Sequence, residues 1–208
     1  MMMNDEQRRK ILETLVYRQK YEKFRQYIPN GKAESFIRMV GEGEQFISLF
    51  SAANGVGKTA CGVNILCNIL YPDNNPWFNF PIYKRFPYLK RGRIVSDPTT
   101  IKDQIVPELK YWFPRGRYEY QFGGKSYPRS WVTDTGFSFD LMTYDQDVKE
   151  FESVSLGFCW FDEPPPEAIY KATVSRMRRG GIIYITETPL IGSAWMYDSF
   201  ITQAKEYD

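Results

Sequence analysis

The sequence contains no histidine among its 208 residues. Imidazole is the usual general base near neutral pH and a common zinc ligand, so its absence excludes histidine-based catalysis and histidine metal sites. Only three cysteines are present, Cys61, Cys67 and Cys159, and they fall in segments that we expect to form the core. We therefore expect buried, reduced thiols, as in a cytosolic protein, and not a disulfide framework.

The chain also lacks a long hydrophobic run and a strong net charge. No apolar stretch approaches the roughly 18 residues that span a bilayer, and the opening methionines are followed by Asn-Asp-Glu, so we expect no secretory signal and no membrane association. The net charge is only +2. Any contact with nucleic acid must then come from local basic patches. The hydrophobic content of 43% and charged content of 25% are those of an ordinary globular domain.

The most informative segment is residues 54–59, with the sequence Asn-Gly-Val-Gly-Lys-Thr. It follows a β-like run at 46–50 and precedes an apolar, helix-like run at 60–70. Strand, glycine-bearing loop, Gly-Lys-Thr and helix is the layout of a phosphate-binding loop, in which backbone N–H groups and the helix N-terminus attract an anion. The usual motif has a glycine where this chain has Ala52, and an ordinary glycine-rich turn is the alternative.

Each residue type in this loop has a chemical reason to be there. Gly55 and Gly57 let the backbone approach phosphate without a Cβ in the way. Lys58 supplies a full charge for the β- and γ-phosphates, and the Thr59 hydroxyl can bind Mg²⁺. The sequence thus predicts ATP as substrate and Mg²⁺ as cofactor, and the predicted ATP-binding residues are Ala53, Asn54, Gly55, Val56, Gly57, Lys58, Thr59 and Ala60.

A second motif is an apolar run at 156–161 that ends in two acids, Asp162 and Glu163. Such a run is typical of a strand that is buried on both faces. In a phosphate-binding-loop ATPase, the first acid holds Mg²⁺ and the second polarises the attacking water, so we assign Asp162 to the metal and Glu163 to catalysis. A solvated turn before the prolines at 164–166 is the alternative. Lys58 and Asp162 are roughly 100 positions apart, which leaves room for the strand–helix units of a doubly wound sheet between them.

The remaining pattern predicts one domain of alternating helices and strands. Asn4 and Gln7 form a possible capping box for a leading helix, within residues 4–28, that runs to about Gln26 and packs one face on the core. The NTPase core would occupy 29–190, and 191–208 would begin a linker or lid. Within the core we expect helices at 33–39, from 97 to near Pro107 and at 167–178, strands at 93–96, 137–141 and 182–185, an irregular segment at 71–91, and a loop or β excursion at 111–135.

Several of these segments together resemble the large terminase subunit of tailed bacteriophages, the motor that pumps DNA into a procapsid. The resemblance covers roughly residues 29–190. It rests on the phosphate-binding loop at 51–59, the strand and turn at 93–98, the stretch 137–147 with 151–152, the acidic strand end at 162–165, Arg176, the glycines at 180–181, and Thr-Glu-Thr-Pro at 186–189.

The resemblance implies an α/β P-loop NTPase of the additional-strand, catalytic-glutamate type, with a mostly parallel central sheet flanked by helices. It implies a Mg²⁺-dependent ATPase that translocates double-stranded DNA in the host cytoplasm. The implied partners are a portal protein, a small terminase subunit and further copies of the chain in a ring, or a monomer in isolation. A helicase-like nucleic-acid translocase and an ATP-gated assembly protein are the alternatives.

Two departures from the family pattern matter. Many terminases carry an arginine inside the loop where this chain has Asn54, so an arginine acting from the loop is in doubt. Large terminases normally continue into an RNase H-like nuclease with clustered acids, and we expect no nuclease within these 208 residues.

Other candidate residues follow from the same resemblance. Thr186 and Thr188 stand where motors of this kind couple hydrolysis to movement, although either could simply cap a turn. Arg176 could complete a neighbouring subunit's site, with Arg129 and Arg178 as reserves, or could only favour the helix dipole. Glu34 lies where the family contacts adenine, but a glutamate at a helix start is common. Apart from the resemblance, five basic residues among aromatics could bind DNA phosphate or form a solvated loop: Lys84, Arg85, Lys90, Arg91 and Arg93.

Overall fold

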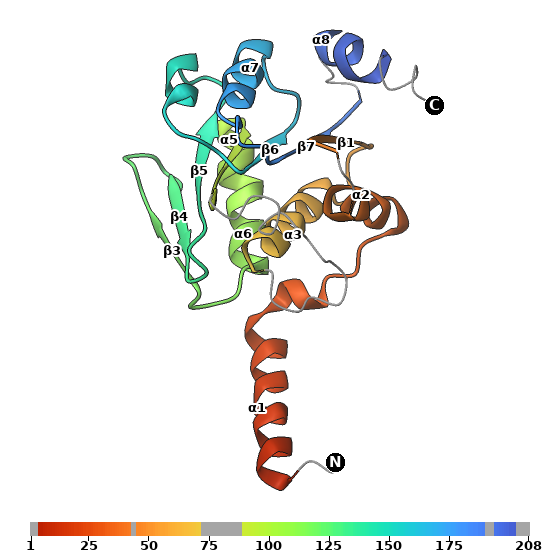
Figure 1. Cartoon of the computed structure of the whole chain (residues 1–208), viewed down its shortest axis with the longest axis vertical. Helices are drawn as coiled ribbons and strands as arrows, with labels where there is room; N and C mark the ends of the chain where they lie inside the picture. Colours follow the sequence, from red (N-terminus) through yellow and green to blue (C-terminus); the bar gives the residue numbers. More distant parts are fainter. Residues whose placement is uncertain (1–3, 43–44, 72–88, 190–193, 203–208) are drawn as a thin grey trace.

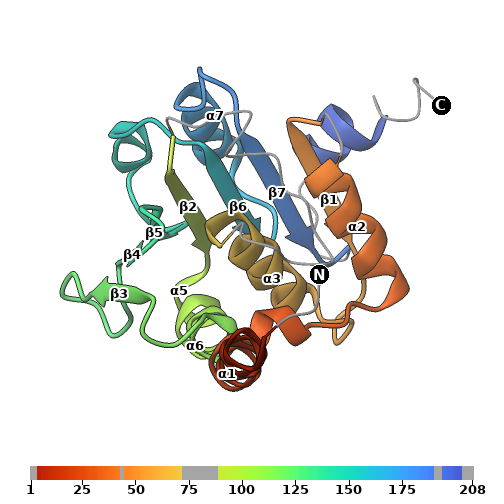
Figure 2. The ribbon, with the colours of Figure 1, turned by 60° about the horizontal axis from the view of Figure 1, so that its bottom comes forward.

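The computed structural model describes residues 4–42, 45–71, 89–189 and 194–202. Within them a seven-stranded sheet has the order β1-β7-β6-β2-β5-β4-β3. β1, β7, β6, β2 and β5 run parallel, and β4 and β3 continue the sheet antiparallel. The predicted mostly parallel α/β sheet is confirmed (Figure 2). The strands are β1 (Ile47–Ser51), β2 (Arg91–Ser96), β3 (Tyr118–Gln121), β4 (Ser130–Thr133), β5 (Ser138–Thr143), β6 (Phe158–Asp162) and β7 (Ile182–Glu187).

The central strands are apolar because helices cover both of their faces. Along β6, Phe158 and Trp160 join one core while Cys159 and Phe161 join the other, as the alternation of side chains in a strand requires. The first core includes α2 (Gly31–Glu42), α3 (Lys58–Leu70) and α6 (Val106–Trp112). The second includes η3 (Val148–Glu152) and α7 (Glu167–Ser175), which lies across the sheet from α3 in Figure 1. All three cysteines are free and buried, as expected.

The strand order brings the two sequence motifs to one edge of the sheet. β7 pairs with β1 on one side and with β6 on the other, so it separates the strand before the glycine loop from the strand before Asp162. β7 therefore occupies the place of the additional strand that the resemblance implied. Because the strands are parallel, the glycine loop, the two acids and the end of β7 all emerge at the carboxyl edge, where α/β sheets bind ligands.

The helix after β2 does not end near Pro107, which corrects the sequence prediction. It continues from α5 (Pro98–Thr100) through a π-helical turn, η2 (Ile101–Ile105), into α6. A proline inside a helix lacks the N–H donor and clashes with the carbonyl four residues earlier. The wider π turn, in which the Val106 N–H donates to the Ile101 carbonyl, stands directly before Pro107. The segment 111–135 forms the β excursion, with β3 and β4 as an antiparallel pair.

The leading helix does not pack on the core, which is a second correction. Asn4 and Gln7 form the predicted capping box, but α1 (Asp5–Tyr21) has no buried residue and projects from the body (Figure 1). Its apolar side chains Ile11, Leu12, Leu15 and Val16 are exposed. The helix also ends before the predicted Gln26. The chain turns at Glu22 into a short 3₁₀ helix, η1 (Lys23–Gln26), and packing begins only with Phe24.

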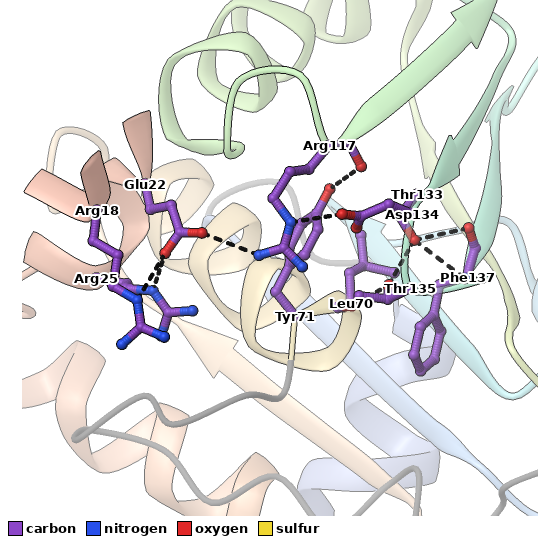
Figure 3. Close-up of polar contacts among 10 residues, drawn as sticks. All are labelled: Arg18, Glu22, Arg25, Leu70, Tyr71, Arg117, Thr133, Asp134, Thr135 and Phe137. Carbon is purple, nitrogen blue, oxygen red and sulfur yellow. Dashed lines mark hydrogen bonds and ion pairs between the residues drawn. The ribbon is translucent and has the colours of Figure 1, made fainter. Parts of the chain in front are cut away.

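Glu22 marks this change because its carboxylate is buried among cations. It pairs with Arg117 at 3.0 Å and with Arg25, and Arg117 in turn pairs with Asp134 at 2.7 Å (Figure 3). A buried carboxylate needs such partners to offset its desolvation. The base of α1 is thereby tied to the β3–β4 unit. The sequence showed only that apolar residues recur with a helical period. That period does not reveal which of these residues reach the core.

Two further expectations differ in detail. α7 ends at Ser175 and not at 178, and the residues after β7 that are described form α8 (Ala194–Met196) and η4 (Tyr197–Ile201). Met196 is buried in the second core. Most of the expected irregular segment at 71–91 lies outside the described residues. Among the residues that are described, no helix combines the length and apolarity needed to cross a membrane.

Candidate functional site

The loop between β1 and α3 has the backbone of an anion nest. Gly55 and Gly57 both have φ of 81°, in the left-handed region that a side chain disfavours. Gly57 is the N-cap of α3, so the first N–H groups of that helix face the loop. Lys58 is buried, and its Nζ donates to the carbonyls of Ala52 at 2.8 Å and Ala53 at 3.1 Å. Its charge therefore lies inside the loop, where an anion would sit.

A cavity of about 590 Å³ opens at this loop and gathers most of the predicted residues. From the loop and its helix come Asn54, Gly55, Gly57, Lys58, Thr59 and Ala60, and from the strand ends come Asp162, Glu163 and Thr188. Of the predicted ATP-binding and coupling residues, Ala53, Val56, Glu34 and Thr186 do not line it. The loop and the strand ends thus bring together the cation of Lys58, backbone donors and the carboxylates of Asp162 and Glu163, which suits a phosphorylated substrate with a cation.

Asp162 is a buried carboxylate at the end of β6. The Thr186 hydroxyl donates to its Oδ1 at 2.7 Å and itself accepts from the Trp160 indole N–H at 2.9 Å. Burial raises the pKa of Asp162 to about 6, against the lowering effect of this hydrogen bond. Thr186 is fully buried, so its hydroxyl orients Asp162 and does not face the cavity. The role of Thr186 in coupling hydrolysis to movement stays a prediction, and in this structure its hydroxyl reaches the cavity only through Asp162.

Glu163 lies directly after Asp162 in an unusual backbone conformation. Its φ of 66° makes it the only non-glycine residue in the left-handed region among the described residues. Its two carboxylate oxygens accept from Thr188, Oε2 from the backbone N–H and Oε1 from the hydroxyl, both at 2.9 Å. The same hydroxyl lies 3.0 Å from Asn54 Oδ1. Glu163, the end of β7 and the glycine loop are therefore joined in one network.

The residues present fit a Mg²⁺ ion. Thr59 and Asp162 line the same cavity and offer hydroxyl and carboxylate oxygens, the hard ligands that Mg²⁺ takes. Burial is the main cause of the raised pKa of Asp162, and the nearby carboxylates of Glu163 and Asp97 also raise it. No cluster of three or more potential ligands from His, Cys, Asp and Glu occurs in the described part of the chain. Mg²⁺ usually binds one or two carboxylates together with substrate phosphates.

One wall of the cavity was not predicted from the sequence. It comes from the turn after β2 and from the helix that follows, and its residues are Asp97, Thr100, Asp103, Gln104, Pro107 and Glu108. Asp97 was recognisable as the polar residue that ends a buried strand at the carboxyl edge. The others lie within the predicted helix or just after it, and no local pattern showed which side of that helix would face the glycine loop.

Glu34, the candidate adenine contact, does not line the cavity. Glu34 pairs with Arg38 on the exposed side of α2 at 2.8 Å. Asn30 is the residue of this segment that reaches the loop, because its side-chain N–H₂ donates to the Val56 carbonyl at 3.0 Å. It also caps α2 by accepting from the Ala33 N–H at 3.0 Å. The sequence signal for Asn30 was its place directly before a helix.

The remaining basic candidates lie away from the cavity. Arg176 follows α7, and its carbonyl accepts from Leu156 N–H beside the start of β6, at the opposite edge of the sheet from Asp162. Its guanidinium donates to the Glu152 carbonyl at 2.9 Å. Arg129 and Arg178 are exposed, and neither lines the cavity. Arg176 is therefore outside its own subunit's site, and a role in a neighbour's site stays a prediction.

The predicted DNA contacts are only partly described. Lys84 and Arg85 lie outside the described residues. Arg93 is buried, and its guanidinium donates to the Phe151 carbonyl at 3.1 Å, so it is not a surface contact. Lys90 donates to the Thr135 carbonyl at 2.9 Å, and Arg91 pairs with Asp140 at 2.8 Å. The Asp140 carboxylate offsets the charge of Arg91, which weakens this patch as a phosphate-binding surface.

Comparison with solved structures identifies a similar fold. The structure of the large terminase from the thermophilic bacteriophage D6E, in complex with ADP, matches with a TM-score of 0.58 and 13% sequence identity. The match covers 89% of this chain and 43% of that protein, so this chain spans less than half of its length. At this identity the likeness shows the fold alone. No protein-family model and no curated protein matches the chain.

Proposed function

We propose that this chain is the Mg²⁺-dependent ATPase motor domain of a phage large terminase, which hydrolyses ATP to move double-stranded DNA into a procapsid. The observation that carries the proposal is the convergence of Lys58, Asp162 and Glu163 on one cavity at the carboxyl edge of the sheet. The terminase with a similar fold was crystallised with ADP, which supports a nucleotide as the ligand.

The chain's own groups account for each requirement of hydrolysis. The N–H groups of residues 55–59 and the N-terminus of α3 cradle the phosphates, and Lys58 exchanges its two carbonyl partners for phosphate oxygens. Glu163 accepts a proton from a water molecule as that water attacks the γ-phosphorus. The bond from the γ-phosphorus to the bridging oxygen breaks, and ADP and phosphate leave.

Thr59 and Asp162 would hold the metal. When bound, Mg²⁺ neutralises charge on the β- and γ-phosphate oxygens. Asp162 is suited to this role because Thr186 and Trp160 fix its orientation before any ligand arrives.

The proposed setting is the host cytoplasm. Double-stranded DNA, a portal protein, a small terminase subunit and further copies of the chain in a ring are the proposed partners. Cations that contact DNA would come from local patches, since the net charge is only +2.

The test is phosphate release from ATP by the full chain, with and without double-stranded DNA, over a range of protein concentrations. Glu163→Gln should lower turnover roughly 10²–10⁴-fold while MgATP still binds. Glu167→Gln is the matched control, because Glu167 lies only four residues on but pairs with Lys171 on the exposed side of α7.

The outcomes separate the candidate functions. Stimulation by double-stranded DNA without strand separation supports the packaging motor. Strand separation would indicate a helicase-like translocase, and turnover that follows protein assembly but ignores DNA would indicate an ATP-gated assembly protein. No turnover under any of these conditions would overturn the ATPase proposal.

A further inference from the structure

A tyrosine outside the predicted site holds the backbone of Glu163. Tyr144 follows β5, and its hydroxyl lies 2.6 Å from the carbonyl oxygen of Glu163. The carbonyl oxygens of Val95 and Asp162 are each 3.1 Å from the same hydroxyl. These carbonyls belong to the end of β2, the end of β6 and the turn that follows β6. One phenol therefore joins the strand ends that form the floor of the site.

The shortest of these contacts identifies the carbonyl oxygen that accepts the hydrogen bond of the Tyr144 hydroxyl. A phenol has a single O–H donor, so it cannot satisfy three carbonyls at once. The contact to Glu163 is the shortest, and it falls on a residue whose backbone needs support.

The left-handed backbone at Glu163 is costly for a residue with a side chain. Such a conformation is unfavourable for a residue with a Cβ, and it persists only when the surroundings hold it. Two hydrogen bonds do so here, one on each side of the residue. The Glu163 N–H donates to the Thr186 carbonyl at 2.7 Å, and the Glu163 carbonyl accepts from Tyr144.

This backbone conformation decides where the carboxylate points. With φ near 66°, the side chain of Glu163 reaches the backbone N–H and hydroxyl of Thr188 beside the glycine loop. Relaxation of Glu163 to an ordinary negative φ would swing its Cβ, and the carboxylate would leave this position. Tyr144 does not line the cavity, and its hydroxyl contacts the backbone of Glu163, so it would act through the backbone alone.

We propose that Tyr144 is a positioning residue for the catalytic glutamate, because its hydroxyl fixes the left-handed backbone that aims Glu163 at the substrate. The inference rests on the proposed ATPase function for its catalytic consequence. Its structural content, the coupling of Tyr144 to the geometry of Glu163, does not depend on that function.

The experiment compares Tyr144→Phe with Tyr71→Phe in the full chain. Tyr71 is a matched control because its hydroxyl also donates to a backbone carbonyl, that of Arg117 at 3.2 Å, far from the site. Tyr144→Phe should lower kcat roughly tenfold, the effect of about 1.4 kcal/mol, with KM for ATP changed less than about twofold. Tyr71→Phe should leave both constants unchanged.

A double variant distinguishes positioning from general damage. In a Glu163→Gln background, Tyr144→Phe should have no further effect on the residual rate, because no carboxylate remains to be aimed. An undiminished kcat in Tyr144→Phe, an equal loss in Tyr71→Phe, or a further tenfold loss in the double variant would each overturn the proposal.

A readout without turnover keeps the inference separate from the ATPase proposal. The Thr188 N–H donates to Glu163, so its amide hydrogen exchange reports whether the carboxylate is in place. Exchange at Thr188 should be faster in Tyr144→Phe than in the parent chain and in Tyr71→Phe. If the parent chain hydrolyses no ATP but shows this difference, the proposed function fails and the positioning role stands. Unchanged exchange would refute the positioning role itself.

Discussion

Thr188 holds both carboxylate oxygens of Glu163, with its backbone N–H on Oε2 and its hydroxyl on Oε1, each at 2.9 Å. The hydroxyl has one proton and also lies 3.0 Å from Asn54 Oδ1. Glu163 and Asn54 therefore compete for the same donor. A phosphate that draws Asn54 aside would leave the hydroxyl wholly to Glu163, which connects occupancy of the glycine loop to the candidate base.

This geometry predicts different effects for two substitutions of Thr188. Thr188→Val keeps the side-chain shape and the backbone N–H but removes the hydroxyl, so we expect kcat to fall roughly tenfold with little change in KM. Thr188→Ser keeps the hydroxyl and should retain most of the activity. Steady-state ATPase kinetics provide the measurement. Full activity in Thr188→Val, or an equal loss in both variants, would show that the hydroxyl does not hold the base.

Lys58→Ala should abolish measurable ATP turnover and weaken nucleotide binding. Lys58 is the only charged side chain in the glycine loop, and its Nζ already lies against the loop carbonyls of Ala52 and Ala53. Titration with a fluorescent ATP analogue measures the affinity. Lys149→Ala, at an exposed position in η3, controls for the loss of one positive charge. Near-normal turnover in Lys58→Ala would contradict the phosphate-binding assignment.

Asp162→Asn should stabilise the metal-free protein at neutral pH while it impairs the use of Mg²⁺. The folded-state pKa of Asp162 is raised from 3.8 to about 6, chiefly by burial. The folded protein then binds more protons than the unfolded chain between these values, and it loses stability as pH rises from about 4 to about 6. The loss in the free energy of unfolding, roughly 3 kcal/mol, is fully present well above pH 6.

Removal of this charge should therefore raise the free energy of unfolding at pH 7.5 and have little effect near pH 3.5. Urea unfolding of both proteins at the two pH values, with EDTA present, measures the difference. The amide oxygen that Asp162→Asn introduces can still accept from Thr186, so loss of that hydrogen bond does not complicate the comparison. Equal stabilisation at both pH values would contradict a charge effect.

Arg176 is the candidate for an arginine finger that acts between subunits. Because Asn54 cannot place a positive charge over the γ-phosphate, a motor of this kind should take one from elsewhere, and such a finger contributes about 10³–10⁵ in rate. Arg176→Gln removes the charge but keeps N–H donors for the Glu152 carbonyl that Arg176 contacts. We expect the parent chain's specific activity to rise with concentration and Arg176→Gln to be nearly inactive.

A mixing experiment tests whether Arg176 acts on the site of a neighbouring subunit. Arg176→Gln mixed with Glu163→Gln should recover some activity, since one subunit keeps the base and its neighbour keeps the finger. Arg178→Gln, at an exposed position nearby, is the comparison. Activity per subunit that does not change with concentration, together with no recovery on mixing, would mean that no finger acts between subunits.

The local motifs could be predicted because their signals are short-range. Gly57 before Lys58 determines a left-handed turn and a helix start within a few residues, whatever surrounds them. The apolar run that ends at Asp162 similarly required a strand covered on both faces. The capping box of Asn4 and Gln7 is local as well, and it formed although the helix after it has no buried residue.

Only the tertiary structure decided what these elements contact. Thr186 and Thr188 lie two positions apart at the end of β7 and read alike in the sequence, yet one is fully buried against Asp162 and the other lines the cavity. Tyr144 reaches Glu163 only because β5, β2 and β6 are neighbours in the sheet. Burial, pKa and hydrogen-bond partners depend on groups that are distant in the chain, so no local pattern can encode them, whereas backbone conformation and hydrophobic period are properties of consecutive residues.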